Sequence, residues 1–291
     1  MVASEVGPRG RAVVVTGASS GIGEAIALGL ALRGFRVYAG VRRQTDADAL
    51  LAQAATLKTR ITTVILDVTK ADHIASVVDR VGNETGSSGL AGVVNNAGIA
   101  VAGPMEFIPL EDLREQFEIN VLGKVALTQA FMPLIRSSHG RLVFIGSVSG
   151  LVSSRLLGSY AASKFALEAV ADAFRRELQP WNIGVSIVEP GRIATPIWQK
   201  SVEMAMTRLE RMPPEATSRY EAVMKDVING AEEATKVGTP PAAVARAVHR
   251  ALTDARPRTR YFVGTDAHII NVLRRVLSDP LFDRLIRVTG R

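Results

Sequence analysis

The stretch Thr16-Gly17-Ala18-Ser19-Ser20-Gly21-Ile22-Gly23 decides the fold of this 291-residue chain. It joins an apolar run at residues 12–15 to an amphipathic segment at residues 23–33, so a glycine-rich turn connects a strand to a helix. Such a turn lets the backbone approach a pyrophosphate, and the helix N-terminus offers unpaired N–H groups. Its spacing, G-x-x-x-G-x-G, differs from the G-x-G-x-x-G fingerprint, so an ordinary tight turn is the alternative. Its position in a βαβ unit favours a dinucleotide site formed by Gly17, Ser19, Ser20, Gly21, Ile22 and Gly23.

On both sides of this turn, short apolar runs alternate with longer amphipathic segments. The predicted strands cover residues 12–15, 36–41, 61–66, 92–94, 141–145 and 184–188. The predicted helices cover residues 23–33, 46–57, 72–81, 113–135 and 160–179. Almost continuous apolar runs are typical of strands that are covered on both faces. The pattern predicts an α/β Rossmann fold, a doubly wound parallel sheet with helices on both faces.

No repeat or linker divides the chain, so we expect a single domain. Residues 11–196 would form the cofactor-binding and catalytic core, and residues 197–239 a helical insertion at the substrate site. Methionines among the charges of this insertion favour an adaptable apolar pocket over plain packing. A helix at 242–253, a strand at 261–263 and an amphipathic tail at 265–291 would complete the fold. We expect the tail to pack within the protein, with a second subunit or a membrane surface as alternatives.

The composition excludes several classes of protein. The chain has no cysteine, which excludes disulfides, thiolate catalysis and thiolate metal sites and favours a cytoplasmic location. No segment resembles a signal peptide or a membrane span, so no integral membrane association is expected. The four histidines are scattered and no carboxylate cluster accompanies them, so we expect no catalytic metal.

The net charge of +7 lies mostly in one region. Residues 241–291 contain ten arginines and four aspartates, which accounts for +6 of it. Such charge is usually a solvated surface, although an acidic carrier protein could dock on it. Aromatic residues are sparse in this region, so nucleic-acid binding is not expected.

The second predicted strand is followed by Arg42 and Arg43. An NAD site would place a carboxylate at this strand end to bind the adenosine ribose. Two guanidinium groups can instead pair with the 2′-phosphate of NADP through bidentate hydrogen bonds. The sequence therefore favours NADP, and Asp46 and Asp48 further along keep NAD as the alternative.

Three later residues could carry acid–base chemistry. Ser147 follows the fifth predicted strand, and Tyr160 and Lys164 lie four apart, on one face of a predicted helix. A free tyrosine has a pKa of about 10, too high for proton exchange at neutral pH. A neighbouring ammonium would lower the pKa of Tyr160 and make it a general acid and base. Ser147 could hydrogen-bond the substrate oxygen.

These motifs together resemble those of the short-chain dehydrogenases/reductases, closely over residues 11–196 and loosely over residues 240–264. The matching motifs are residues 16–23, Leu66-Asp67-Val68-Thr69, Asn95-Asn96-Ala97-Gly98, Ile119-Asn120-Val121, Ser147, Tyr160-x-x-x-Lys164 and Pro190-Gly191-x-x-x-Thr195. Weaker markers resemble the hydroxysteroid and retinol dehydrogenase-like branch: residues 36–42, Arg175-Arg176-Glu177-Leu178 and Val188-Glu189-Pro190-Gly191.

The resemblance implies a role for each matching residue. Tyr160 would give a proton to the carbonyl oxygen while nicotinamide delivers hydride to carbon, and Ser147 would orient that oxygen. Lys164 would bind the nicotinamide ribose and lower the pKa of Tyr160, and Asn120 would hold a water that links Lys164 to solvent. The other implied cofactor contacts are Asp67 and Val68 at adenine, Asn96, Ala97 and Gly98 on the adenosine side, and Ile193 and Thr195 at the nicotinamide carboxamide or diphosphate.

We therefore expect an NADP(H)-dependent oxidoreductase that interconverts a secondary alcohol and a ketone on a lipophilic, steroid- or lipid-like substrate. As in the family, a homodimer or homotetramer is expected. A 3-oxoacyl-carrier-protein reductase-like enzyme is one alternative, with the basic C-terminal region as the docking surface. A non-catalytic nucleotide-binding sensor is another. Four apolar residues would either line the substrate pocket or serve as ordinary packing: Val148, Val152, Leu156 and Leu157.

Overall fold

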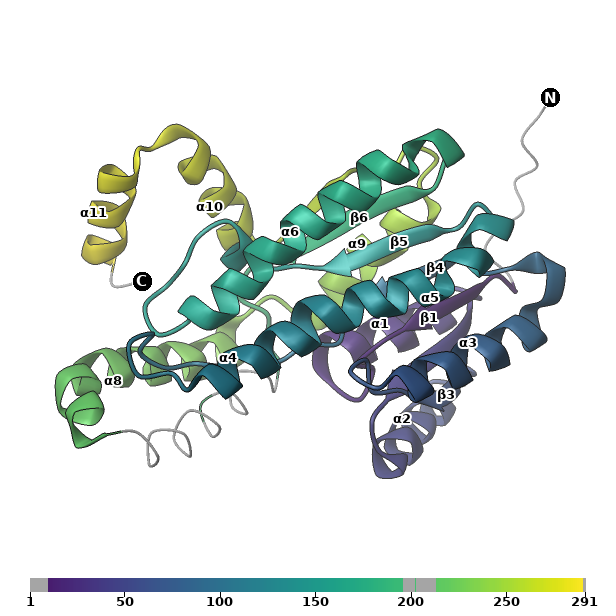
Figure 1. Ribbon diagram of the computed structural model, residues 1–291, viewed down its shortest axis with the longest axis horizontal. Coiled ribbons are helices and arrows are strands. Elements are labelled where there is room, and N and C mark those ends of the chain that lie inside the picture. Colours follow the sequence, from purple (N-terminus) through teal and green to yellow (C-terminus); the bar gives the residue numbers. More distant parts are fainter. Residues whose placement is uncertain (1–9, 196–201, 203–212, 290–291) are drawn as a thin grey trace.

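The computed structural model describes residues 10–195, 202 and 213–289. Within these residues, seven parallel strands form one sheet in the order β3-β2-β1-β4-β5-β6-β7. The strands are β1 Ala12–Val15, β2 Arg36–Val41, β3 Thr62–Ile65, β4 Gly92–Asn95, β5 Arg141–Ile145, β6 Gly184–Pro190 and β7 Arg260–Val263. Helices cover both faces of the sheet (Figure 1), which confirms the predicted doubly wound α/β fold.

The helices alternate with the strands along the chain. The longer ones are α1 Gly21–Ala31, α2 Gln44–Thr56, α3 Ala71–Thr85, α4 Leu110–Phe117, α5 Gly123–Ser137, α6 Gly158–Leu178, α8 Pro214–Val237, α9 Pro241–Thr253, α10 Thr265–Val276 and α11 Asp279–Thr289. Four short turns of helix complete the described elements: η1 Gly86–Ser88, η2 Glu118–Leu122, η3 Val148–Gly150 and η4 Gln179–Trp181.

The apolar strands build a core on each face of the sheet. Side chains alternate between the faces along a strand, so Val13 and Val15 of β1 belong to one core and Ala12 and Val14 to the other. Helices α1, α2 and α9 supply the first core, and α3, α5 and α6 the second. The sheet is therefore covered on both sides, which explains why its strands are almost continuously apolar.

The chain crosses the sheet at β1. It runs outward from β1 to β3 on one side and then returns to β4 on the other. Ligands of such sheets bind in the crevice beyond the carboxyl ends of the strands, where the strand order reverses. The turns that follow β1, β4 and β5 gather at this edge, and they carry most of the predicted site residues.

The predicted helix at 113–135 is interrupted in the structure. It consists of α4, the π-helical turn η2 and α5. A π-helical turn adds one residue to a helical turn and is often found at functional sites. Asn120 lies within η2, so the interruption changes the direction of this predicted site residue.

The region after the sheet core agrees partly with the prediction. The insertion contains helix α8 at the carboxyl end of the sheet (Figure 1). Met224 of α8 is buried, whereas Met204, Met206 and Met212 lie outside the described residues. The tail forms two helices, α10 and α11. Ala267 and Phe282 are buried there, whereas four other apolar residues are exposed: Ile269, Val272, Val276 and Leu281.

Candidate active site

The glycine-rich turn after β1 has a backbone that only glycine adopts readily. Gly17 and Gly21 have φ angles of +65° and +59°, in the left-handed region. A Cβ atom on Gly23 would lie 2.0 Å from the Gly17 carbonyl oxygen. Ser20 is the N-cap of α1, and its side chain makes no capping hydrogen bond. Unlike Ser20, Ser19 is exposed. The turn thus presents a side-chain-free cradle and the N-terminus of α1 to an anion.

Asn96 fastens this turn to the end of β4. Its side-chain amide donates to the carbonyl oxygens of Thr16 and Gly17, at 2.9 and 3.0 Å. The Thr16 hydroxyl in turn accepts from the backbone N–H groups of Asn96 and Ala97. Asn96 and Ala97 therefore hold the glycine-rich turn against the end of β4. Their contact with the adenosine side of the cofactor stays a prediction.

The two arginines after β2 differ in their surroundings. Arg43 forms an ion pair with Asp46, with hydrogen bonds of 2.7 and 3.0 Å. The exposed Arg42 makes no hydrogen bond or ion pair with any residue that the structure describes. Its positive charge interacts with the carboxylate of Asp67, which follows β3. Arg42 is therefore the freer of the two cations for a 2′-phosphate.

Asp67 and Val68 lie at the third strand end, as predicted from the sequence. Burial raises the pKa of Asp67, but the hydrogen bonds from Thr69 and the charge of Arg42 lower it by a larger amount. The net pKa therefore lies below its usual value. Val68 is buried and packs on Gly123, where a Cβ atom would lie 2.8 Å from the Val68 side chain. The carboxylate is thus held within its own turn, beside the Arg42 charge.

The predicted catalytic residues meet at the carboxyl end of β5. Ser147 begins the turn η3, and its hydroxyl hydrogen-bonds the phenol of Tyr160. The Lys164 amine lies 5.4 Å from the centroid of the Tyr160 ring, one helical turn along α6. Lys164 Nζ donates to the carbonyl oxygen of Ile145, the last residue of β5, at 2.9 Å. The structure therefore brings the three side chains together.

The acidity of this group differs from the expectation. Burial raises the pKa of Tyr160 to about 12, and the hydrogen bond from Ser147 opposes this only in part. Burial also lowers the pKa of Lys164 to about 8. In the protein chain by itself, desolvation of the phenol therefore dominates the pKa of Tyr160, and the lowering of that pKa by Lys164 stays a prediction.

Asn120 is fully buried and fastens the chain after β4. Its side chain accepts from the N–H of Ile99 at 2.9 Å, and donates to the Ile99 carbonyl oxygen and to the Ser163 hydroxyl, at 3.0 and 3.1 Å. Ser163 donates to the carbonyl oxygen of Tyr160. Asn120 thus connects η2 to the catalytic helix through protein atoms, and its water-holding role stays a prediction.

The two residues predicted to contact the nicotinamide carboxamide or the diphosphate lie after β6. Ile193 is buried and pairs with Thr239 in an isolated bridge. Thr195 is also buried, and its hydroxyl oxygen has no hydrogen-bond partner among the described residues. Asp266 of α10 accepts from the backbone N–H of Arg192, at 2.7 Å. The loop after β6 is therefore held by Asp266 and Thr239. The Thr195 hydroxyl could bind a ligand, because it has no hydrogen-bond partner among the described residues.

Helix α8, predicted to lie at the substrate site, packs against the loops that follow β4 and β5. Tyr220 of α8 packs edge-on against Phe107, with the ring centroids 6.2 Å apart. Ion pairs join Arg219 to Glu106 and Arg155 to Asp226. The four predicted pocket residues are all partly buried on the facing loop and helical turn, at Val148, Val152, Leu156 and Leu157.

Sequence reasoning missed a group of buried charges beside the catalytic helix. Glu168 lies one turn after Lys164 and binds Arg260 of β7. Glu189 of β6 is fully buried 3.4 Å from the same guanidinium. Lys124 of α5 is also fully buried, and it donates to the same carbonyl oxygen as Lys164. The spacing of four from Lys164 to Glu168 was the available signal.

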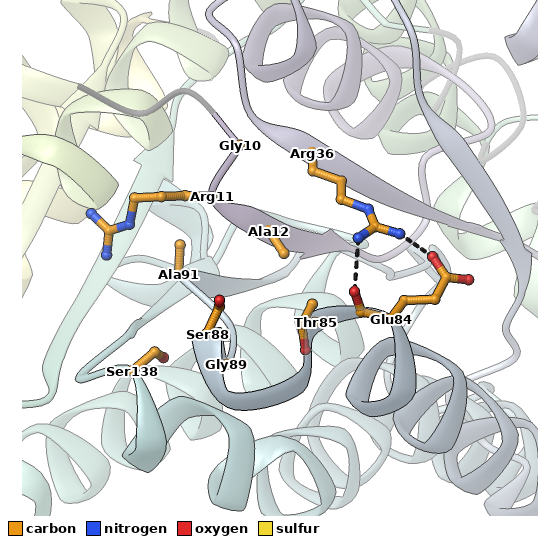
Figure 2. Close-up of a pocket in the computed structure, with 10 residues that line it drawn as sticks. All are labelled: Gly10, Arg11, Ala12, Arg36, Glu84, Thr85, Ser88, Gly89, Ala91 and Ser138. Atoms are coloured by element: carbon orange, nitrogen blue, oxygen red, sulfur yellow. Dashed lines mark hydrogen bonds and ion pairs between the residues drawn. The ribbon is translucent and has the colours of Figure 1, made fainter. Parts of the chain in front are cut away.

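A pocket lies at the opposite end of the sheet, where the strands begin. It has a volume of about 400 Å³ and is lined by residues at the amino ends of strands, among them Arg11, Arg36 and Ala91, together with Glu84 (Figure 2). Arg36 and Glu84 form an ion pair across it. None of the predicted site residues lines it, so it is distinct from the catalytic centre.

The described residues contain neither a candidate metal cluster nor a candidate membrane-spanning helix. No group of three or more histidines, aspartates or glutamates in this part of the chain could hold a metal ion. No helix in the described ranges is both long and apolar enough to cross a bilayer. The oligomeric state and the cytoplasmic location stay predictions.

Comparisons with known proteins give the family. A sequence model described as short chain dehydrogenase matches residues 11–205. The NADPH-dependent 3-dehydrocapnine reductase of Ornithobacterium rhinotracheale is 32% identical over 94% of this chain and 95% of its own length. Retinol dehydrogenase 5 of Mus musculus is 35% identical over 89% and 82%, and 17-beta-hydroxysteroid dehydrogenase type 6 of Bos taurus is 36% identical over 94% and 87%.

Comparison of the fold with solved structures gives the same family. A short-chain dehydrogenase from Streptomyces avermitilis matches with a TM-score of 0.75 and 28% identity, over 98% of this chain and 97% of that one. The chain therefore belongs to the short-chain dehydrogenase family, and it is an oxidoreductase that acts on CH–OH groups. The predicted resemblance to hydroxysteroid and retinol dehydrogenases is confirmed.

Proposed function

We propose that this oxidoreductase uses NADP(H) to interconvert a secondary alcohol and a ketone on a lipophilic, steroid- or lipid-like substrate. The observation that carries the proposal is the meeting of Ser147, Tyr160 and Lys164 at the carboxyl end of β5. A phenol, a hydroxyl and an amine in one place suit proton transfer to a carbonyl oxygen.

The residues at the sheet edge fit a dinucleotide. The turn after β1 is packed so closely that a Cβ atom on Gly17 or Gly23 would clash with neighbouring protein atoms, and it presents the N-terminus of α1 to an anion. The buried Thr195 hydroxyl has no partner among the described residues and would accept or donate a hydrogen bond at the nicotinamide end. The free guanidinium of Arg42 supports NADP over NAD, because a 2′-phosphate is an anion that arginine binds well. The name of the Ornithobacterium relative, an NADPH-dependent reductase, points the same way.

In the proposed reduction, the chain's own groups manage the oxygen and the proton. Ser147 Oγ and Tyr160 Oη both hydrogen-bond the carbonyl oxygen of the substrate and stabilise the charge that develops on it. Tyr160 Oη then gives its proton to that oxygen. The Lys164 ammonium offsets the phenolate left behind, which favours the transfer from a phenol whose pKa burial raises to about 12. Nicotinamide, when bound, supplies the hydride that reduces the carbon.

A lipophilic substrate suits the surroundings of these groups. Four partly buried apolar residues follow Ser147, and α8 closes the same side with Tyr220 and Met224. Ligand pockets are mostly apolar with a few placed polar groups. The bovine relative is named for hydroxysteroids and the murine one for retinol, both lipophilic alcohols.

A reductase of carrier-bound substrates has less support. Several arginines of the basic C-terminal region are bound to carboxylates of the chain itself: Arg250 to Asp254, Arg274 to Asp279, and Arg260 to three acidic residues. These cations are partly neutralised, so they attract an acidic partner less strongly.

The test combines cofactor binding with turnover. We expect NADPH to bind more tightly than NADH in a fluorescence titration, and a panel of hydroxysteroids, ketosteroids and retinoids to contain a substrate. In the Tyr160→Phe variant, turnover of that substrate should fall by roughly 10²- to 10⁴-fold while NADPH affinity changes little, because the ring remains and only the proton donor is lost. Full activity of Tyr160→Phe would contradict the proposed acid.

A further inference from the structure

Lys124 is a buried lysine that the proposed reaction does not use. It lies on α5, one turn after Asn120 and one turn before Thr128, and all three residues are fully buried. Lys124 and Thr128 lie on the face of α5 that packs on the ends of two strands, and Asn120 precedes them in η2. Thr128 accepts a hydrogen bond from Asn95 of β4 at 3.0 Å, and Lys124 Nζ donates to the carbonyl oxygen of Ile145 of β5 at 3.4 Å.

The amine of Lys124 shares this acceptor with the amine of Lys164. Lys164 Nζ donates to the same Ile145 oxygen at 2.9 Å. A carbonyl oxygen has two lone pairs, so it can accept from both amines. The two nitrogens therefore lie within two hydrogen-bond lengths of each other. In such a buried site two ammonium groups would repel each other strongly, because little water screens them.

The neighbouring charges decide which amine keeps its proton. Burial lowers the pKa of Lys164 to about 8, but the carboxylate of Glu168 acts in the opposite direction. Tyr160 is the other titratable group at Lys164. Lys124 differs from Lys164 in its surroundings. Burial and the charge of Lys164 lower the pKa of Lys124 well below its usual range, and no carboxylate in the described part of the chain pairs with it.

Glu168 is itself part of a larger group that keeps it near Lys164. Its carboxylate binds Arg260 of β7, and that guanidinium also lies within 4 Å of Asp172 of α6 and Glu189 of β6. The acidic groups therefore lie on the α6 side of Lys164, and Lys124 approaches from α5. The proton of the pair belongs with Lys164.

We propose that Lys124 is a positioning residue of the active site: a neutral amine that holds the Ile145 carbonyl and keeps Lys164 in place and protonated beside Tyr160. This inference rests on the proposed role of Lys164. A neutral amine donates an N–H to the carbonyl and offers a lone pair, so it supports a neighbouring ammonium without repelling it. An apolar side chain in its place would leave the ammonium in a less polar site.

The charge of Lys124 can be measured directly. The chain has seven lysines, so a protein labelled with carbon-13 at lysine Cε gives a readable NMR spectrum. The signal of Lys124 is identified by its loss in Lys124→Met or Lys124→Gln. We expect it to be neutral at pH 7 and to titrate far below about 10.4, the usual pKa of lysine. Titration near that usual value would overturn the proposal. No substrate is needed, so this result is independent of the proposed function.

The role of Lys124 in turnover is tested with two matched variants. Lys124→Met keeps the length of the side chain and removes the amine, whereas Lys124→Gln supplies a neutral N–H donor. We expect Lys124→Met to lower kcat/KM roughly 10- to 100-fold, because a displaced catalytic group costs about that much. The limb of the pH profile that reports Lys164 should move to lower pH, because its ammonium loses support. Lys124→Gln should restore most of the activity.

Two results would overturn the positioning role. If the limb moves to higher pH in Lys124→Met, the removed group was a cation that repelled Lys164. If the pH profile is unchanged and only the unfolding midpoint falls, Lys124 is a packing residue. Should Lys124→Met fail to fold, the NMR titration of the wild-type protein and the pH profile of Lys124→Gln, which should match that of the wild type, decide the question.

Discussion

Glu168 of α6 accepts two hydrogen bonds from Arg260 of β7, at 2.9 and 3.1 Å. Glu168 lies one turn after Lys164 on α6, so the Glu168–Arg260 pair holds α6 against β7, the last strand of the sheet. The same guanidinium lies 3.3 Å from Asp172 and 3.4 Å from Glu189. One arginine therefore lies beside three acidic side chains, of which Glu168 and Glu189 contact little water.

Removal of Arg260 should destabilise the protein strongly. The Arg260→Met variant keeps much of the side-chain volume but leaves the buried Glu168 carboxylate without its counter-ion, which costs about 3–5 kcal/mol in comparable sites. The urea midpoint of unfolding measures this loss. Arg176→Met is the matched control, because Arg176 pairs with Asp172 on the exposed surface. Its loss should be at most about 1 kcal/mol. Equal losses in the two variants would contradict the central role of Arg260.

Glu189 should make stability depend on pH. Burial, followed by the charge of Glu168, raises its pKa to about 8 in the folded protein. In the unfolded chain a glutamate has a pKa of about 4.3. Between these values the unfolded chain has released the proton and the folded protein still holds it. The folded state then binds more protons, so the stability contributed by this group falls as the pH rises through this range.

The Glu189→Gln variant removes this dependence, because an amide resembles the protonated carboxyl and does not titrate. Relative to the wild type, its melting temperature should therefore rise between pH 5 and pH 8, by an amount equivalent to roughly a few kcal/mol at most. Glu221→Gln on exposed α8 serves as the control and should show no such trend. A relative melting temperature of Glu189→Gln that falls towards pH 8 would show that Glu189 is ionised in the folded protein.

Much of the fold follows from apolar periodicity. The strands at 12–15, 36–41 and 141–145 agree with the structure to the residue, because each contains an apolar run that ends before a polar residue or a glycine. The π-helical turn at η2 could not be predicted in this way. It adds a single residue within a continuous helical pattern, and the backbone of Ile99, which Asn120 binds, lies far away in sequence.

The active site was predictable as a set of motifs but not as a network of charges. Lys164 and Tyr160 share a helix face, which spacing alone indicates. The burial of Lys124 depends on how α5 packs on β4 and β5, and a lone lysine in an amphipathic segment is normally expected to face solvent. The raised pKa of Tyr160 likewise depends on desolvation, which sequence spacing does not report.

Arg42 should contribute more than Arg43 to the preference for NADPH. Arg43 is held by Asp46 through two hydrogen bonds, whereas Arg42 makes neither a hydrogen bond nor an ion pair with any described residue. Arg42→Ala should therefore weaken NADPH binding by roughly 10- to 100-fold and leave NADH binding nearly unchanged, because only NADPH carries the extra phosphate. Arg43→Ala should weaken it less. Fluorescence titration of both nucleotides into both variants measures this, and a larger loss in Arg43→Ala would reverse the assignment.

Tyr220 of α8 should affect substrate binding more than cofactor binding. Its ring packs edge-on against Phe107, and its hydroxyl hydrogen-bonds Glu106. Such a ring contact contributes about 0.5–1.5 kcal/mol beyond the buried area. Tyr220→Ala should therefore raise the KM for a bulky lipophilic substrate about tenfold, with the NADPH Kd unchanged. Tyr220→Phe keeps the ring and should stay near the wild-type KM. A changed NADPH Kd in Tyr220→Ala would contradict this prediction. It would mean that α8 supports the cofactor site, because loss of the ring contact would then disturb the residues that bind the nucleotide.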